Sequence, residues 1–340
     1  MRFSGDGREP PPPVCDRRGS DHSAVGTVGW FWISSLVPNT HSVLDMGYAD
    51  YGGGSTAEGM PIGGSQHTMA GMSHSSSAGA RPVDSLTVGA DTPAQLTVTL
   101  TARKQTFALA GGRSVAGYTL NGTSPGPVIR GVQGELVEVH LHNESVPDGV
   151  TLHWHGVDVP NANDGVAGVT QDAVPIGGEF VYRFILTQAG TYWYHSHQVS
   201  DEQVVGGLLG ALIVVPAGSA NPDGGREDPL DQLALVHIYD GRRTINGVDG
   251  DSAVSVPVNR PVRVRVINTD NGPMPVWVTG ASYRLLAIDG TELNRPTPIV
   301  DQAVQVTAGG RADLEIVRQA DGAPVRVIMG GVGITNAVRR

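Results

Sequence analysis

Two His-x-His triplets lie 42 positions apart in this 340-residue chain, at His153–His155 and at His195–His197. In an extended strand, side chains two positions apart point to the same face, with a rise of about 6.6 Å between them. Each triplet therefore presents two imidazoles on one face and apolar or aromatic neighbours on the other. Four neutral imidazoles favour Cu, Zn, Fe or Ni over the oxygen-preferring cations.

The spacing within a triplet is wide for two ligands of one ion, and it suits two metal ions about 3.5–4 Å apart. The alternative is that these are buried histidines whose hydrogen bonds are satisfied inside a β-sheet. For a single histidine that alternative is the better interpretation, but two triplets on aromatic strands favour a metal site. The predicted metal ligands are His153, His155, His195 and His197.

The elements that must position these side chains are strands. Glycine (47 residues) and proline (23) are abundant and only 16% of residues are charged, which is typical of an all-β fold with many turns. Within residues 135–143 the alternation places Val137 and Val139 toward the core. It places a third His-x-His pair, His140 and His142, toward solvent, so we do not expect these two to bind metal.

A repeat relates two segments, residues 120–143 and 245–268. The second segment contains VRVRVIN, whose valines are expected to point inward and Arg263 and Arg265 outward. One β-sandwich used twice in tandem explains the repeat. Two pairs of asparagines share the same offset of 125 residues: Asn121 with Asn246, and Asn143 with Asn268.

Residues 1–83 are expected to form a disordered leader and a linker rich in Met, His, Gly and Ser. Its apolar run, residues 24–38, is shorter than the roughly 20 residues that cross a bilayer. Two interpretations stay open: the end of a membrane segment that begins upstream of the assigned start codon, or a hydrophobic patch. The methionines and histidines of the linker could either capture copper or simply be solvated. They are Met60, His67, Met69, Met72 and His74.

The formal net charge of −10 and the lack of a basic stripe exclude nucleic acid as a partner. The single cysteine, Cys15, excludes an internal disulfide and lies in the leader.

Two stretches, residues 153–178 with HWHG and residues 190–216 with YHSH, resemble the multicopper oxidases, a family that includes laccases and bacterial copper-tolerance oxidases. The resemblance implies two cupredoxin-like (plastocyanin-like) Greek-key β-sandwiches, at residues 84–217 and 227–340. The second would correspond to the copper-free middle domain of three-domain members.

By the same resemblance, His153 matches a ligand of the type 2 copper. His155 and His195 match ligands of one type 3 copper, and His197 matches a ligand of its partner. Asp164 matches an acidic residue that delivers protons to bound oxygen, although an Asp before Gly is also typical of a turn.

Three aromatic residues beside these ligands are expected to pack around the imidazoles and orient them: Trp154, Trp193 and Tyr194. Copper is the expected cofactor, and the expected partners are O2 and a reducing substrate, either Cu(I) or a phenolic or similar donor. The expected location is the cell envelope or outside the cell, with an N-terminal membrane tether.

The family pattern breaks after the second triplet. His237 is the only histidine beyond His197, it lies in a predicted strand where a structural role is expected, and no cysteine follows Cys15. The resemblance implies a type 1 copper, held by a cysteine and two histidines, and a cluster of three further copper ions. The ligands of the type 1 copper and half of the ligands of that trinuclear cluster are therefore missing. We expect a truncated chain, equivalent to the first two of three domains, without oxidase turnover of its own.

Two other functions remain as alternatives. A non-catalytic copper-binding or scaffold protein of the envelope would retain four histidines without a route for electrons. A copper nitrite reductase also has two such domains, but it needs a cysteine where this chain has Ser196.

Overall fold

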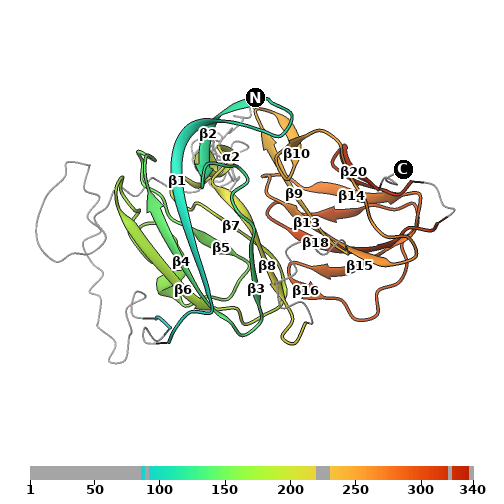
Figure 1. The fold of residues 1–340 in the computed structure, drawn as a ribbon, viewed down its shortest axis with the longest axis horizontal. Coiled ribbons are helices and arrows are strands. Elements are labelled where there is room, and N and C mark those ends of the chain that lie inside the picture. Colours follow the sequence, from blue (N-terminus) through green and yellow to red (C-terminus); the bar gives the residue numbers. More distant parts are fainter. Residues whose placement is uncertain (1–85, 89–91, 220–229, 321–323, 337–340) are drawn as a thin grey trace, which may run out of the picture. The chain divides into compact units, whose positions relative to one another are not determined.

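The computed structural model describes residues 86–88, 92–219, 230–320 and 324–336. The chain is all-β, as predicted, and its strands form two β-sandwiches that belong to one compact unit (Figure 1). The predicted leader, its apolar run and the Met/His linker lie outside the described residues, as does Cys15. The described part contains no helix with the length and hydrophobicity that a membrane span requires.

The first sandwich packs two four-stranded sheets face to face. One sheet has the order β2 (Ser114–Leu120), β1 (Leu96–Ala108), β4 (Leu136–Asn143) and β6 (Glu179–Ile185). The other has the order β3 (Ile129–Val132), β8 (Leu209–Val215), β7 (Gly190–His195) and β5 (His153–His155). The 3-10 helix η2 (Asn161–Asn163) follows β5, and the short helix α2 (Ser200–Val205) follows β7.

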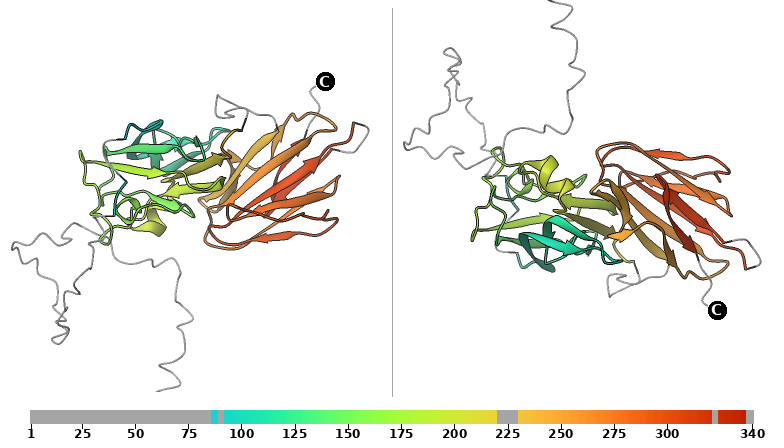
Figure 2. Two further views of the ribbon diagram at one scale, coloured as in Figure 1. Left: turned by 90° about the horizontal axis from the view of Figure 1, so that it is seen from below. Right: turned by 90° about the horizontal axis from the view of Figure 1, so that it is seen from above.

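The second sandwich has a seven-stranded and a five-stranded sheet, whose orange to red strands form two layers in Figure 2. The larger sheet has the order β11 (Val248–Asp249), β10 (Arg242–Ile245), β9 (Asp231–Tyr239), β13 (Pro261–Asn268), β18 (Arg311–Val317), β15 (Tyr283–Ile288) and β16 (Thr291–Glu292). The smaller has the order β12 (Ser252–Val254), β20 (Val332–Asn336), β19 (Arg326–Met329), β14 (Met274–Thr279) and β17 (Val304–Val306).

The repeat has a structural counterpart at its first pair of asparagines. Asn121 and Asn246 both adopt a left-handed conformation, with φ of 55° and 52°. In each, the side-chain oxygen accepts a backbone N–H and the amide nitrogen donates to a carbonyl two residues earlier in the same strand. Asn tolerates this conformation because its short polar side chain bonds the neighbouring backbone. The two copies therefore turn in the same way at equivalent positions.

Burial follows the predicted alternation with one difference. The valines of β13 are buried in the second core, as are Val137 and Val139 of β4 in the first. Arg265 points away from its own core, as predicted, but it is not solvent-exposed: its side chain is 4% accessible. It donates to Thr191 of β7 and pairs with Asp313 of β18. Arg265 is buried although it points outward, because the first sandwich covers that face of β13.

His237 of β9 also connects the two sandwiches. Its ring is buried, with Nδ1 2.8 Å from the Thr269 hydroxyl and Nε2 donating to the carbonyl of Val205 in α2 at 3.2 Å. The nearest carboxylate, Asp270, lies 3.9 Å from Nδ1. Both ring nitrogens therefore have hydrogen-bond partners, in line with the structural role expected for His237.

We predict that His237 makes the fold acid-sensitive. Burial lowers its pKa to about 4, whereas an unfolded chain protonates histidine near pH 6.5. The neutral ring therefore contributes stability above that pH, and the contribution is lost as pH falls toward 4. Between pH 7 and 4.5 the wild-type free energy of unfolding should fall by about 2 kcal/mol more than that of His237→Gln. Urea denaturation across this range measures both, and an identical pH dependence would contradict the prediction.

Candidate metal centre

The two triplets meet because β5 and β7 are antiparallel neighbours. In their register His153 lies opposite His195, and His155 lies opposite Trp193. β5 is the edge strand of its sheet, so its outer side is not covered by another strand of that sheet. The alternate face of both strands contributes to the first core, which fixes the histidines on the opposite face.

The imidazoles converge on one small region. The ligand atoms of His153, His155 and His195 all lie within 4.8 Å of one another. Nδ1 of His155 is 3.3 Å from Nε2 of His195. His197 is not in this group of three, but its ring centroid is 5.4 Å from that of His153. Within the first triplet the two ring centroids are 6.0 Å apart, close to the spacing expected for a strand.

Backbone carbonyls hold the outer nitrogens of two rings. Nδ1 of His153 donates to the carbonyl of Asp164 at 2.9 Å, and Nδ1 of His195 donates to that of Ser196 at 2.8 Å. A carbonyl oxygen only accepts, so these nitrogens carry the ring proton and each neutral ring keeps a lone pair on Nε2. A ring proton donated to a backbone carbonyl in this way is typical of metal-binding histidines.

Asp164 lies against His153 with its side chain as well as its backbone. Its Oδ1 is 3.2 Å from Nδ1 of His153. Burial by itself would lower the pKa of His153, but the bonds to Asp164 outweigh burial and raise it. The same side-chain bond lowers the pKa of Asp164.

The other three rings are neutral near pH 7. Burial, followed by the charge of Arg311, lowers the pKa of His155 to about 4. Burial also lowers the pKa of His195 and of His197. Neutral imidazole is the form that binds metal, so the site does not need to lose protons from these rings before an ion enters.

These donors fit a copper or zinc ion. Two nitrogens 3.3 Å apart have the separation of two ligands on one tetrahedral ion with metal–nitrogen bonds of about 2.0–2.1 Å. The group is all-nitrogen and half to fully buried, which suits borderline metals and not magnesium or calcium. No cysteine contributes among the described residues, since the only cysteine lies outside them.

Of the three aromatic residues expected to orient the imidazoles, only Trp193 contacts them. It stacks on His155 with ring centroids 4.7 Å apart and lies 4.3 Å from the ring of His195. Trp154 and Tyr194 point into the first core instead, where both are fully buried. The expectation was wrong for these two because alternate residues of a strand face opposite ways.

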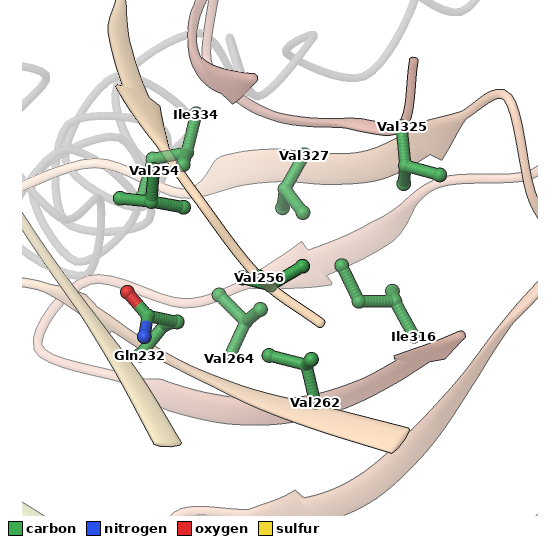
Figure 3. A pocket seen from close by; sticks show the side chains of 9 residues that line it. All are labelled: Gln232, Val254, Val256, Val262, Val264, Ile316, Val325, Val327 and Ile334. Carbon is green, nitrogen blue, oxygen red and sulfur yellow. The ribbon is translucent and has the colours of Figure 1, made fainter. Parts of the chain in front are cut away.

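Within the described part of the chain, the other His-x-His pair and the small cavity of the second sandwich do not add to this centre. His140 and His142 lie on the outer, partly exposed face of β4, as predicted, where they pair with Glu138 and Glu179. The small cavity in the second sandwich, shown in Figure 3, has a volume of about 10 Å³ and is lined by valines, isoleucines and Gln232. It has room for about one water molecule and is too small for a substrate.

Sequence reasoning missed two residues of the second sandwich that touch the site. A β-carbon at Gly309 would lie 2.9 Å from Cε1 of His155, and the charge of Arg311 lowers the pKa of that ring. Neither residue has a signal in the sequence, because both follow the triplets by more than 100 positions in an ordinary Gly-Gly-Arg turn.

Comparison with known proteins shows which proteins the first sandwich is similar to. Residues 101–219 match the family model described as multicopper oxidase. Laccase-1 of Botryotinia fuckeliana is 29% identical over 223 residues, which cover 59% of this chain and 39% of the laccase. A copper resistance protein A homolog of Pseudomonas syringae pv. tomato is 39% identical over 103 residues, covering 30% of this chain and 17% of that protein.

A solved structure agrees with these sequence matches. The multi-copper oxidase from Pseudomonas thermotolerans superposes with a TM-score of 0.62 at 25% identity, covering 71% of this chain and 63% of that one. Residues 101–219 therefore match a multicopper oxidase domain, and the two sandwiches have the cupredoxin-like fold of the solved multicopper oxidase. It spans less than half the length of the two curated relatives.

The turn after η2, which positions Asp164, depends on a glycine at position 165. Gly165 has φ of +73°, and a β-carbon there would overlap the carbonyl of Leu152, next to His153. Gly165→Ala should lower the free energy of unfolding by about 3 kcal/mol, from left-handed strain and overpacking together. The matched control is Gly177→Ala, with φ of +78° and nothing within 4 Å of the added carbon, which should cost about 1 kcal/mol. Equal losses in chemical denaturation would contradict this account.

Proposed function

We propose that His153, His155, His195 and His197 bind copper as half of the oxygen-reducing cluster of a multicopper oxidase. The observation that supports this most directly is the 3.3 Å separation of His155 Nδ1 and His195 Nε2. Two imidazole nitrogens so close, with the other ring nitrogen of His195 already bonded to a carbonyl, suit one shared ion.

Each ligand has a proposed place in that cluster. His155 and His195 share one copper of the type 3 pair, His197 belongs to the other, and His153 belongs to the type 2 copper. Copper held there supplies the one-electron chemistry by which O2 is reduced to water. The protein's part is to hold the four rings in place, three of them with pKa values lowered by burial.

Asp164 has a proposed role in proton delivery. Its carboxylate contacts Nδ1 of His153, on the side of the ring away from Nε2. Its lowered pKa keeps it ionised near neutral pH, so it accepts and passes protons and does not store one. It also holds His153 through its backbone carbonyl, which a substitution of the side chain would leave in place.

The whole protein's activity is proposed as oxidation of Cu(I), or of a phenolic or similar donor, coupled to reduction of O2. We propose a location outside the cytoplasm, in the envelope or beyond it, with an N-terminal membrane tether. Residues 1–340 by themselves are proposed to be inactive, because Cys15 is their only cysteine and His237 is their only histidine after the second triplet.

The first test is copper binding to the purified chain. Wild-type protein should bind copper through imidazole nitrogens, visible as nitrogen hyperfine structure in the electron paramagnetic resonance spectrum of Cu(II). His153→Ala/His195→Ala should remove that site, because it deletes one ring from each strand. The matched control is His140→Ala/His142→Ala, which removes the other strand-borne His-x-His pair and should leave the site unchanged. Equal binding by both double variants would show that the copper lies elsewhere.

The second test is turnover. Copper-loaded chain should consume no O2 above background with Cu(I) or a phenol, and should lack the intense blue absorption of a thiolate-bound copper. An oxygen electrode and a visible spectrum measure both. Sustained O2 consumption without a second protein would overturn the proposed inactivity, whereas copper binding without turnover is the expected result.

A further inference from the structure

The second sandwich reaches the candidate metal centre through one loop, Thr307–Gly310, which joins β17 to β18. The carbonyl of Gly309 accepts the indole N–H of Trp193 at 3.1 Å and a guanidinium N–H of Arg311 at 3.4 Å. Nε of Arg311 donates in turn to the carbonyl of Thr191 in β7 at 3.1 Å. The loop and Arg311, the residue that follows it, are therefore each hydrogen-bonded to β7, the strand that ends at His195.

Trp193 connects the loop to the candidate ligand His155. It lies directly opposite His155 in the β5–β7 register, and the two rings stack at 27°. Trp193 is 4% accessible, so its indole has little room to turn. Its N–H bond to Gly309 fixes the plane of the indole, and the stacked indole limits rotation of the imidazole.

Gly309 also contacts the imidazole itself. Its φ is +67°, and a β-carbon there would lie 2.9 Å from Cε1 and 3.2 Å from Nε2 of His155. Gly156, the residue after His155, has φ of +84°, and a β-carbon there would overlap the guanidinium of Arg311. Both glycines are needed for the loop and the ligand to approach this closely, since any side chain would separate them.

We propose that the Thr307–Gly310 loop and Arg311 act as a positioning element for the copper ligand His155, through Trp193 and through direct contact at Gly309. The second sandwich, although it supplies no candidate ligand among its described residues, thereby shapes the metal centre of the first. This inference rests on the proposed copper site. Contacts that orient ligands in this way are typically worth 10–100-fold in metal affinity.

The test compares Gly309→Ala with Gly241→Ala. Both glycines lie in the second sandwich with positive φ, +67° and +75°, but a β-carbon at Gly241 meets nothing within 4 Å. In metal-free protein, the Cε1–H resonance of His155, shifted by the Trp193 ring current, should move in Gly309→Ala and stay in place in Gly241→Ala. Competition titration with Cu(II) should give an affinity at least about 10-fold weaker for Gly309→Ala only.

A second variant distinguishes a local effect on His155 from a general loss of the fold. Trp193→Phe keeps an aromatic ring beside His155 but loses the N–H that bonds Gly309, so it should weaken Cu(II) binding while retaining the wild-type circular dichroism. Affinities within twofold of Gly241→Ala for both variants, with an unmoved His155 resonance, would overturn the inference. If wild-type chain binds no Cu(II), the proposed function fails, and the resonance of the metal-free ring still decides whether the loop positions it.

Discussion

The register of β5 against β7 is the constraint on which the centre depends. It sets His153 across from His195 and Trp193 across from His155, with alternate residues packed in the first core. Because side chains alternate with a period of two, a slip of one residue would turn the imidazoles of one strand into the core. The apolar residues of the core therefore determine the geometry of the polar site.

β7 fixes this register because it is buried on both faces. Tyr192 and Tyr194 pack in the first core, whereas Thr191 and Trp193 meet the second sandwich. The Thr191 hydroxyl donates to Asp313 at 2.7 Å and accepts from Arg265 at 2.9 Å. Buried charges of this kind are costly unless they are paired and hydrogen-bonded, and here Arg265, Asp313 and Thr191 satisfy one another across the two sandwiches.

Much of the fold could be predicted because its signals are local. The all-β class follows from composition and alternation, and the repeat follows from asparagines such as Asn121 and Asn246, whose turns need only neighbouring residues. Arg265 shows the limit of such reasoning. Alternation correctly places it away from its own core, but what covers it is Thr191, 74 positions earlier in the chain. Trp154 and Tyr194 are next to the ligands in sequence, but they lie on the opposite face of their strands and so pack in the first core and not against the imidazoles.

The sequence by itself determined the donor chemistry: four imidazoles in two triplets, each pair on one face of a strand, together with a family resemblance in the motifs around them. Only the tertiary structure decided how those rings meet, that Asp164 holds His153, and that Gly309 and Arg311 lie against His155. The physical reason is range. Side-chain direction along a strand is fixed by the backbone of adjacent residues. Strand register and loop contacts depend instead on packing between segments far apart in the chain, by more than 150 positions for His155 and Gly309.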